Sequence, residues 1–156
     1  MKKSHLSFIT TFVLFAVIGM NAFSQTAPKA KINTEKIHIN KKGEIHDHGW
    51  NKIGVIGKDD IVRDNKGKTI YFIDKNGNVI DADGKNLGKA QKNGNYYNLA
   101  GENIITVKDK NAEECEILDP NGHNLGTTHK NYKLHACAAH CLALTHKKAK
   151  EKFKTN

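Results

Sequence analysis

The chain has 156 residues and a formal net charge of +9, with 25 Lys and Arg against 16 Asp and Glu, nine His, three Cys and two Pro. This length allows one domain, or one small domain with a tail, and excludes a large multidomain enzyme. The apolar share is only 38%, but regularly spaced Ile, Val, Leu and Tyr argue against global disorder. The 13 Gly and the Asn- and Asp-rich spacers predict many short elements joined by tight turns.

Residues 1–24 have the three-part pattern of a cleaved signal peptide. Two lysines precede an apolar stretch over residues 6–20, and the small-x-small triplet 22–24 predicts Gln25 as the mature start. The apolar stretch is shorter than the roughly 20 residues of a spanning helix. No Cys lies near the cleavage point. We therefore expect an exported protein, periplasmic or secreted, that is not a lipoprotein and has no transmembrane segment after cleavage. Residues 25–34 are expected to form a flexible linker.

The basic excess belongs to the C-terminal end of the chain. From Gln25 to Thr128, 16 basic residues stand against 15 acidic ones, whereas residues 129–156 contain seven Lys and only Glu151 as an acid. Such a lysine-rich tail forms a solvated face, or it contacts an acidic envelope component such as lipopolysaccharide or an anionic membrane surface. Nucleic acid is not the partner that we expect, and the partner itself stays unknown at this point.

Five segments share one pattern, in which an apolar residue precedes an Asp or Asn anchor and Gly usually follows three residues after the anchor. The anchors lie 17, 17, 17 and 21 residues apart. Asp or Asn at the first position with Gly at the fourth is typical of a type I turn that closes on a left-handed residue. The anchors are Asp47, Asp64, Asp81, Asn98 and Asp119, and the glycines are Gly67, Gly84, Gly101 and Gly122, while Trp50 takes the glycine place in the first segment.

A second turn in each unit leaves two strands of about four to six residues, so each unit is predicted to be a β-hairpin. Two apolar columns predict its buried face. One column lies two residues before the anchor (Ile45, Val62, Val79, Tyr96 and Ile117), and the other lies six residues after it (Ile53, Ile70, Leu87, Ile104 and Leu125). Gly follows the second column at Gly54, Gly88 and Gly126, which indicates a bulge or a close backbone approach. A bulge would return Ile56, Ile73, Ala90 and Val107 to the buried face.

One hairpin cannot bury its apolar face alone, so the five units must pool their faces, as an open solenoid or as a ring. Closure removes exposed edges and is the arrangement that we predict. The expected fold is therefore an all-β core of five hairpin repeats over residues 35–128, closed with pseudo-five-fold symmetry. A basic C-terminal α-helix within residues 129–156 follows it.

The repeats resemble those of the five-fold beta-flower family, whose pattern is G-x-[IV]-x-D-x-x-G-x-x-[IL]-G. The cleanest copy is GNVIDADGKNLG at residues 77–88, and the resemblance covers residues 43–128. It implies hairpins arranged like petals around an axis, in secreted or envelope proteins of Gram-negative bacteria. It implies no particular activity and no catalytic residues. The first and fourth copies depart most from the pattern.

Residues 134–152 are predicted to form an α-helix, because the segment is rich in Ala and Leu and contains no Gly or Pro. Cys137 and Cys141 are four residues apart and therefore share one face. Thiolates and imidazoles are ligands that suit zinc or copper. The candidate metal ligands are Cys137, His140, Cys141 and His135, with His123 or His129 as further candidates.

The cysteines have two other interpretations. Thiols of exported proteins tend to pair, and a disulfide from Cys115 to Cys137 or Cys141 would fix the helix to the β-body. Cys is also among the most buried residue types, so the thiols could simply pack unpaired. A weaker metal candidate is a group of three histidines near the first turn, two of which strand alternation places on one solvated face. These are His38, His46 and His48.

The sequence contains no nucleophile elbow, zincin motif, phosphate loop or dinucleotide-binding fingerprint, and we predict no catalytic residue. We therefore expect a non-enzymatic β-repeat protein that acts as an envelope or extracellular binding or structural module of unknown ligand. The alternative is a periplasmic metal-binding protein that uses the Cys/His helix. A third option is a small secreted hydrolase or toxin.

Overall fold

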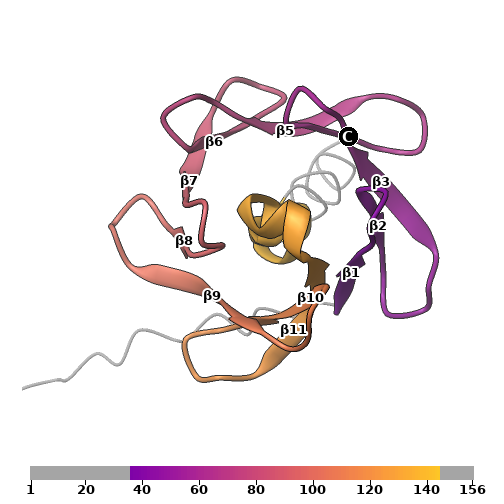
Figure 1. Ribbon diagram of the computed structural model, residues 1–156. Coiled ribbons are helices and arrows are strands. Elements are labelled where there is room, and N and C mark those ends of the chain that lie inside the picture. Colours follow the sequence, from indigo (N-terminus) through magenta and orange to yellow (C-terminus); the bar gives the residue numbers. More distant parts are fainter. Residues whose placement is uncertain (1–35, 145–156) are drawn as a thin grey trace, which may run out of the picture. The chain divides into compact units, whose positions relative to one another are not determined.

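The computed structural model describes residues 36–144, which form eleven short strands and a C-terminal helical segment (Figure 1). The strands are β1 (Ile37–Ile39), β2 (Glu44–His46), β3 (Lys52–Ile56), β4 (Ile61–Arg63), β5 (Thr69–Ile73), β6 (Asn78–Asp81), β7 (Asn86–Ala90), β8 (Tyr96–Tyr97), β9 (Asn103–Asp109), β10 (Glu114–Leu118) and β11 (Asn124–His129). Each strand pairs with its neighbours along the chain, and β1 also pairs with β11, so the sheet is a closed barrel. The predicted all-β closed core with a C-terminal helix is confirmed.

The predicted signal peptide, the linker over residues 25–34 and the end of the chain from residue 145 lie outside the described residues. Within the described part, no helix is long and apolar enough to cross a membrane.

The helical segment lies in the centre of the ring of strands (Figure 1). It begins as the 3₁₀-helix η1 (Lys130–Cys137) and continues as an α-helix over residues 138–144. The prediction of an α-helix from residue 134 is therefore wrong in its first turn, because the chain leaves β11 through a tight 3₁₀ connection, as such short helices often provide. His129 caps this connection, its ring accepting a hydrogen bond from the Asn131 N–H. Residues 145–152 of the predicted helix are outside the described residues.

The five anchor residues make the hydrogen bonds that hold a tight turn. In each, the anchor carbonyl accepts from the N–H three residues later at 3.0 Å. The anchor side-chain oxygen also accepts from the N–H groups two and four residues later, at Asp64 from Lys66 and Lys68. A carboxylate or a carboxamide can do this equally well, which explains why Asn98 serves in one segment.

Each of the five antiparallel pairs that carry these turns contains a register shift. In the pair of β4 and β5, Val62 is opposite Tyr71, and the shift follows directly after Val62. The column two residues before the anchors is fully buried, as predicted. The column six residues after them is only partly buried, which corrects the prediction, because the shift turns the next residue inward. That inward position holds Gly54, Tyr71, Gly88, Ile105 and Gly126. Of the residues predicted to return to the buried face, Ile56, Ile73 and Ala90 are buried and Val107 is partly buried.

The ring closes where β1 meets β11 in a parallel pair, with Ile37 opposite Gly126. A Cβ atom at Gly126, whose φ is +133°, would overlap the carbonyl oxygen of Ile37 and lie 2.7 Å from its nitrogen. The closing strand β1 precedes the first repeated segment, and its residues Ile37 and Ile39 are both buried. Gly126 therefore permits the backbone approach on which closure depends.

We expect Gly126→Ala to lower the free energy of unfolding by about 3 kcal/mol, because the new methyl group meets backbone that cannot move aside without opening the ring. Gly122→Ala is the matched control, since its φ is also positive, at +83°, but nothing lies within 4 Å of the added atom. Its expected cost is about 1 kcal/mol. Urea denaturation measures both. Equal losses would contradict the close approach as the cause.

Candidate functional site

The helical segment fills the inside of the barrel with small side chains. The filling residues are each at most 3% exposed, and they are Ala136, Cys137, Ala138, Ala139, Cys141 and Leu142. Protein interiors are packed to crystal-like density, so a segment enclosed by a ring of strands must present small residues to fit. The chain therefore occupies its own lumen.

Cys137 and Cys141 lie beside each other on this segment and meet two buried tyrosines. The Cys137 Sγ is 3.9 Å from the Tyr71 Oη, and the Cys141 thiol interacts with both Cys137 and Tyr96. Burial raises the pKa of Cys141 and the pKa of Tyr71 well above their ordinary values. Because a thiol must lose its proton to act as a nucleophile or a metal ligand, this environment favours packing over chemistry for Cys141.

The predicted metal ligands do not converge on one point. His135 Nε2 is 3.1 Å from Asp60 Oδ1, whereas the His140 ring packs on the Tyr96 ring, 5.6 Å between centroids. Among the described residues, no group of three His, Cys, Asp or Glu side chains is placed to hold a metal ion. A zinc or copper site made of Cys137, His140, Cys141 and His135 stays a prediction of the sequence without geometric support.

The three thiols are all free and fully buried in this structure. Cys115 is held on β10, where its thiol donates to Asp109 Oδ1 at 3.3 Å. Cys137 faces Tyr71 instead. The disulfide predicted between Cys115 and Cys137 or Cys141 therefore stays a prediction. In the structure Cys115 contacts Asp109, whereas Cys137 and Cys141 lie beside each other.

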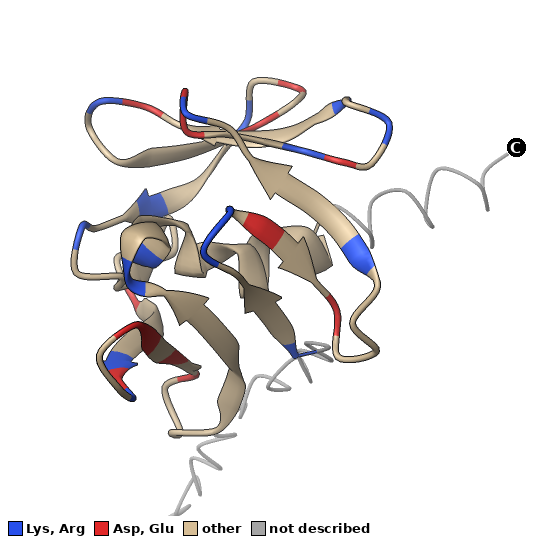
Figure 2. Cartoon of the chain, turned by 45° about the vertical axis from the view of Figure 1, so that its right-hand side comes forward, with Lys and Arg blue, Asp and Glu red and all other residues tan. Residues whose placement is uncertain are grey.

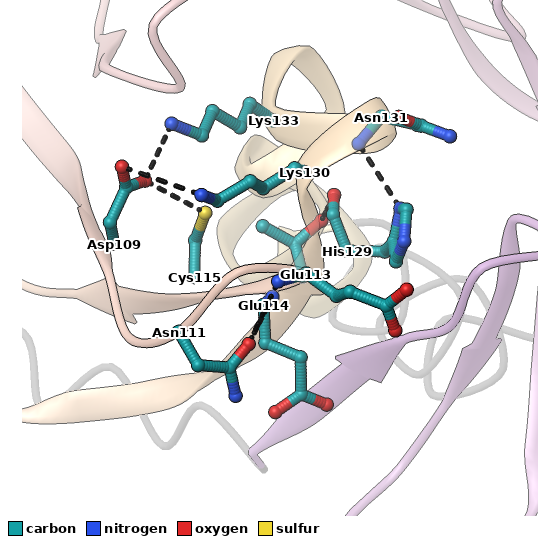
Figure 3. A network of polar contacts seen from close by, with 10 residues as sticks. Asp109, Asn111, Glu113, Glu114, Cys115, His129, Lys130, Asn131 and Lys133 are labelled. Carbon is teal, nitrogen blue, oxygen red and sulfur yellow. Dashed lines mark hydrogen bonds and ion pairs between the residues drawn. The ribbon is translucent and has the colours of Figure 1, made fainter.

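Asp109 is the centre of a polar network that holds the start of η1 to β9 and β10 (Figure 3). Its carboxylate accepts from Lys133 Nζ at 2.7 Å and lies 3.8 Å from Lys130 Nζ. The hydrogen bond from Lys133 lowers the pKa of Asp109 and raises the pKa of Lys133. The backbone N–H of Lys130 also donates to the carbonyl of Glu113 at 2.8 Å. These contacts fix where the helical segment enters the barrel.

An exposed aromatic residue marks the outer surface near the first turn. Trp50 is 68% exposed, and its ring stacks on His38 with centroids 4.7 Å apart and 12° between the planes. The His46 ring also lies beside it, at 6.2 Å. The sequence contained a signal for this surface, since Trp50 stands where four other segments have Gly, but spacing alone did not show that His38 would stack on it. We call Trp50, His38 and His46 the tryptophan patch.

Trp50 and Asp60 are the non-glycine residues with positive φ among residues 36–144, at +62° and +56°. A side chain in the left-handed region costs free energy, on the order of 1–2 kcal/mol. Asp60 takes the place that Gly43, Gly77 and Gly94 hold in the other second turns, all at positive φ. Its carboxylate has a clear reason to be there, because it meets the buried His135. Trp50 has no comparable partner inside the barrel and points to the outside.

Charged residues lie mainly in the turns, with both signs interspersed (Figure 2). Examples are Lys52 with Glu44 at 3.0 Å and Arg63 with Asp59 at 2.8 Å. Hydrogen bonds from Asn40 and then Lys52 lower the pKa of Glu44 to about 2, and the hydrogen bond from Arg63 lowers the pKa of Asp59 to about 2. Exposed pairs of this kind add little to stability.

We expect the free energy of unfolding to fall as the pH is lowered from about 7.5 to about 5. Burial lowers the pKa of His135 and of His140 below 6.5. Because the pKa of each ring is lower in the folded state than in the unfolded state, the neutral rings stabilise the fold fully at a pH above the unfolded-state pKa. This contribution is lost as the pH falls through the folded-state pKa. Chemical denaturation at several pH values measures the slope, and His140→Phe should reduce it. An unchanged slope in His140→Phe would contradict the assignment.

The structure also predicts the thiol count. The purified mature chain should show three reactive thiols with Ellman's reagent in denaturant, the number of Cys in the sequence. In the native state the reaction should be slow, because all three side chains are fully buried. A count of one in denaturant would show instead that two of the cysteines are bridged.

No protein-family model, curated protein or solved structure matches the chain. Its function is therefore argued from the residues described above.

Proposed function

We propose that the chain is an exported, non-enzymatic binding module of the bacterial envelope or exterior, built from five copies of a hairpin unit around a pseudo-five-fold axis. Three observations support this proposal. Five antiparallel pairs carry the same turn hydrogen bonds and the same kind of register shift. The anchors recur at intervals of 17 residues in four of the five segments. The first 24 residues have the pattern of an export signal.

The packed interior favours recognition through the outer surface. The helical segment occupies the centre of the barrel (Figure 1), and Tyr71 and Tyr96 are fully buried. A ligand that entered the barrel would have to displace these residues. We therefore place the contact surface on the turns and the outer strand faces, where binding displaces no buried residue.

The observation that carries the proposal is the exposed and strained Trp50. Strain persists at a position only where the surrounding structure holds it, and it is concentrated at functional positions. Here the stack on His38 holds the indole ring in place while 68% of the residue stays exposed. Trp is also the residue type most enriched among binding hot spots. The tryptophan patch is therefore the contact surface that we propose.

The titratable groups support a non-enzymatic role. The pKa values of Asp47 and Asp74 are lowered, mainly because their carboxylates accept hydrogen bonds from the side chains and the backbone N–H groups of Asn51 and Asn78. A general acid would need the opposite shift. Burial likewise raises the pKa of Cys115 and Cys141, which works against a thiolate nucleophile. The turn carboxylates stabilise turns and the thiols pack in the interior, and these structural roles explain their positions.

Trp50→Gly tests the proposal, because it restores the residue found in the other four segments. We expect the variant to fold with a stability within about 1 kcal/mol of the unchanged chain, since relief of the backbone strain offsets the lost stack. We expect its affinity for isolated bacterial envelopes to fall at least about tenfold, as for loss of a hot-spot residue. Sedimentation of the purified mature chain with the envelopes measures the affinity.

Two controls separate the patch from other surfaces. Leu99→Ala removes the other large exposed apolar side chain of residues 36–144, 66% exposed, and should leave envelope binding unchanged. A chain that ends at residue 144 removes the lysine-rich end, and binding that disappears in this variant alone would assign the contact to that end. Equal sedimentation of the unchanged chain and Trp50→Gly would reject the patch.

A further inference from the structure

A pair of histidines lies on the outer face of the barrel beneath Trp50. His38 on β1 and His46 on β2 are directly opposite each other in an antiparallel pair. The neighbouring pair, Ile39 and Ile45, points into the core, so alternation directs both imidazoles outward. Residues directly opposite in such a pair have Cβ atoms about 4.5–5.5 Å apart. Two imidazoles at this separation can reach one metal ion.

The Trp50 ring lies against both imidazoles and orders the pair. It stacks flat on His38, at 4.7 Å and 12°, and lies tilted beside His46, at 6.2 Å and 49°. A metal ion binds an imidazole nitrogen in the plane of the ring, whereas Trp50 lies on its face. The stack therefore restricts the rotation of His38 and leaves its in-plane lone pair available.

The polar surroundings of the two rings also fit a metal site. His38 Nδ1 is 3.1 Å from Thr127 Oγ1, which fixes one ring nitrogen and leaves the other for a ligand bond, as in the outer shell of many metal sites. His46 Nδ1 is covered and has no hydrogen-bond partner among the described residues. Buried polar atoms are nearly always paired, so this atom needs an explanation.

We infer that His38 and His46 bind one divalent first-row metal ion, such as Cu²⁺, Ni²⁺ or Zn²⁺, with water in the remaining positions. Two protein ligands and open water positions make this a site for exchangeable metal. Cu²⁺ should bind more tightly than Ni²⁺ or Zn²⁺, following the general order for nitrogen ligands. The site is separate from the set on the helical segment, and it does not depend on the proposed binding to envelopes.

Ni²⁺ titration of the purified, untagged mature chain tests this site. Trp50 is the chain's one Trp, so quenching of its fluorescence by the paramagnetic ion reports binding beside it. We expect saturable quenching at one ion per chain, reversed by Zn²⁺. His38→Gln and His46→Gln should each raise the midpoint at least tenfold. His123→Gln, on an exposed side chain beside Asp119 in the last hairpin, is the control and should leave the midpoint unchanged.

Non-saturable quenching, or an unchanged midpoint in either His variant, would overturn the proposal. A raised midpoint in His48→Gln, with none in His38→Gln or His46→Gln, would do the same, because His48 would then be the ligand. Should His38→Gln fail to fold, NMR of the unchanged chain decides instead: Ni²⁺ should broaden the ring signals of His38 and His46 first. Since no envelope is present in these measurements, their failure and the failure of envelope binding are distinguishable.

Discussion

The structure depends on filling the inside of the barrel. Eleven strands of two to seven residues cannot be stable by themselves, and they are held together by what they bury. The ring encloses a space that side chains must fill, because a void forfeits dispersion contacts on every wall. The chain fills it with its own segment of Ala and Cys residues, which Asp109 holds at the entrance through Lys133. The cysteines are thus explained first as residues of the right size.

Tyr71 and Tyr96 complete this filling, because glycines at other inward positions leave room for large side chains. Gly88 leaves the room that Tyr96 occupies, since a Cβ at Gly88 would lie 2.6 Å from the Tyr96 Oη. The same hydroxyl donates to the carbonyl of Leu87 at 2.6 Å, so its polar end is satisfied inside the barrel. Tyr71 instead occupies an inward position that is Gly in three other segments. Large and small residues therefore alternate at the inward positions along the chain, which makes the five strand pairs unequal although their turns are alike.

Local patterns predicted what local physics controls. Hydrogen bonding within a turn depends on residues four apart, so Asp64 and Gly67 could be placed from the sequence. The bulge next to Gly54 and Gly88 could be predicted too. The sequence predicts that the residue six after each anchor points inward, whereas in the structure the next residue does, because a register shift depends on both paired strands. Contacts between distant segments had no such signal. The pair of Asp60 and His135, 75 residues apart, and the stack of Trp50 on His38 follow from closure of the whole ring.

Departures from a local rule separate structural from functional positions in this chain. Asp60 and Trp50 both occupy places where glycine would be free of strain. Asp60 compensates for its strain inside the protein, because its carboxylate satisfies one nitrogen of a histidine that is 2% exposed. Trp50 compensates only in part, through one stacked ring, and leaves most of its apolar surface in water. The strain and the stack offset each other, so stability alone does not explain Trp at residue 50 in place of the Gly of the other four segments. This is why we propose the surface that Trp50 shares with His38 and His46 as the contact surface.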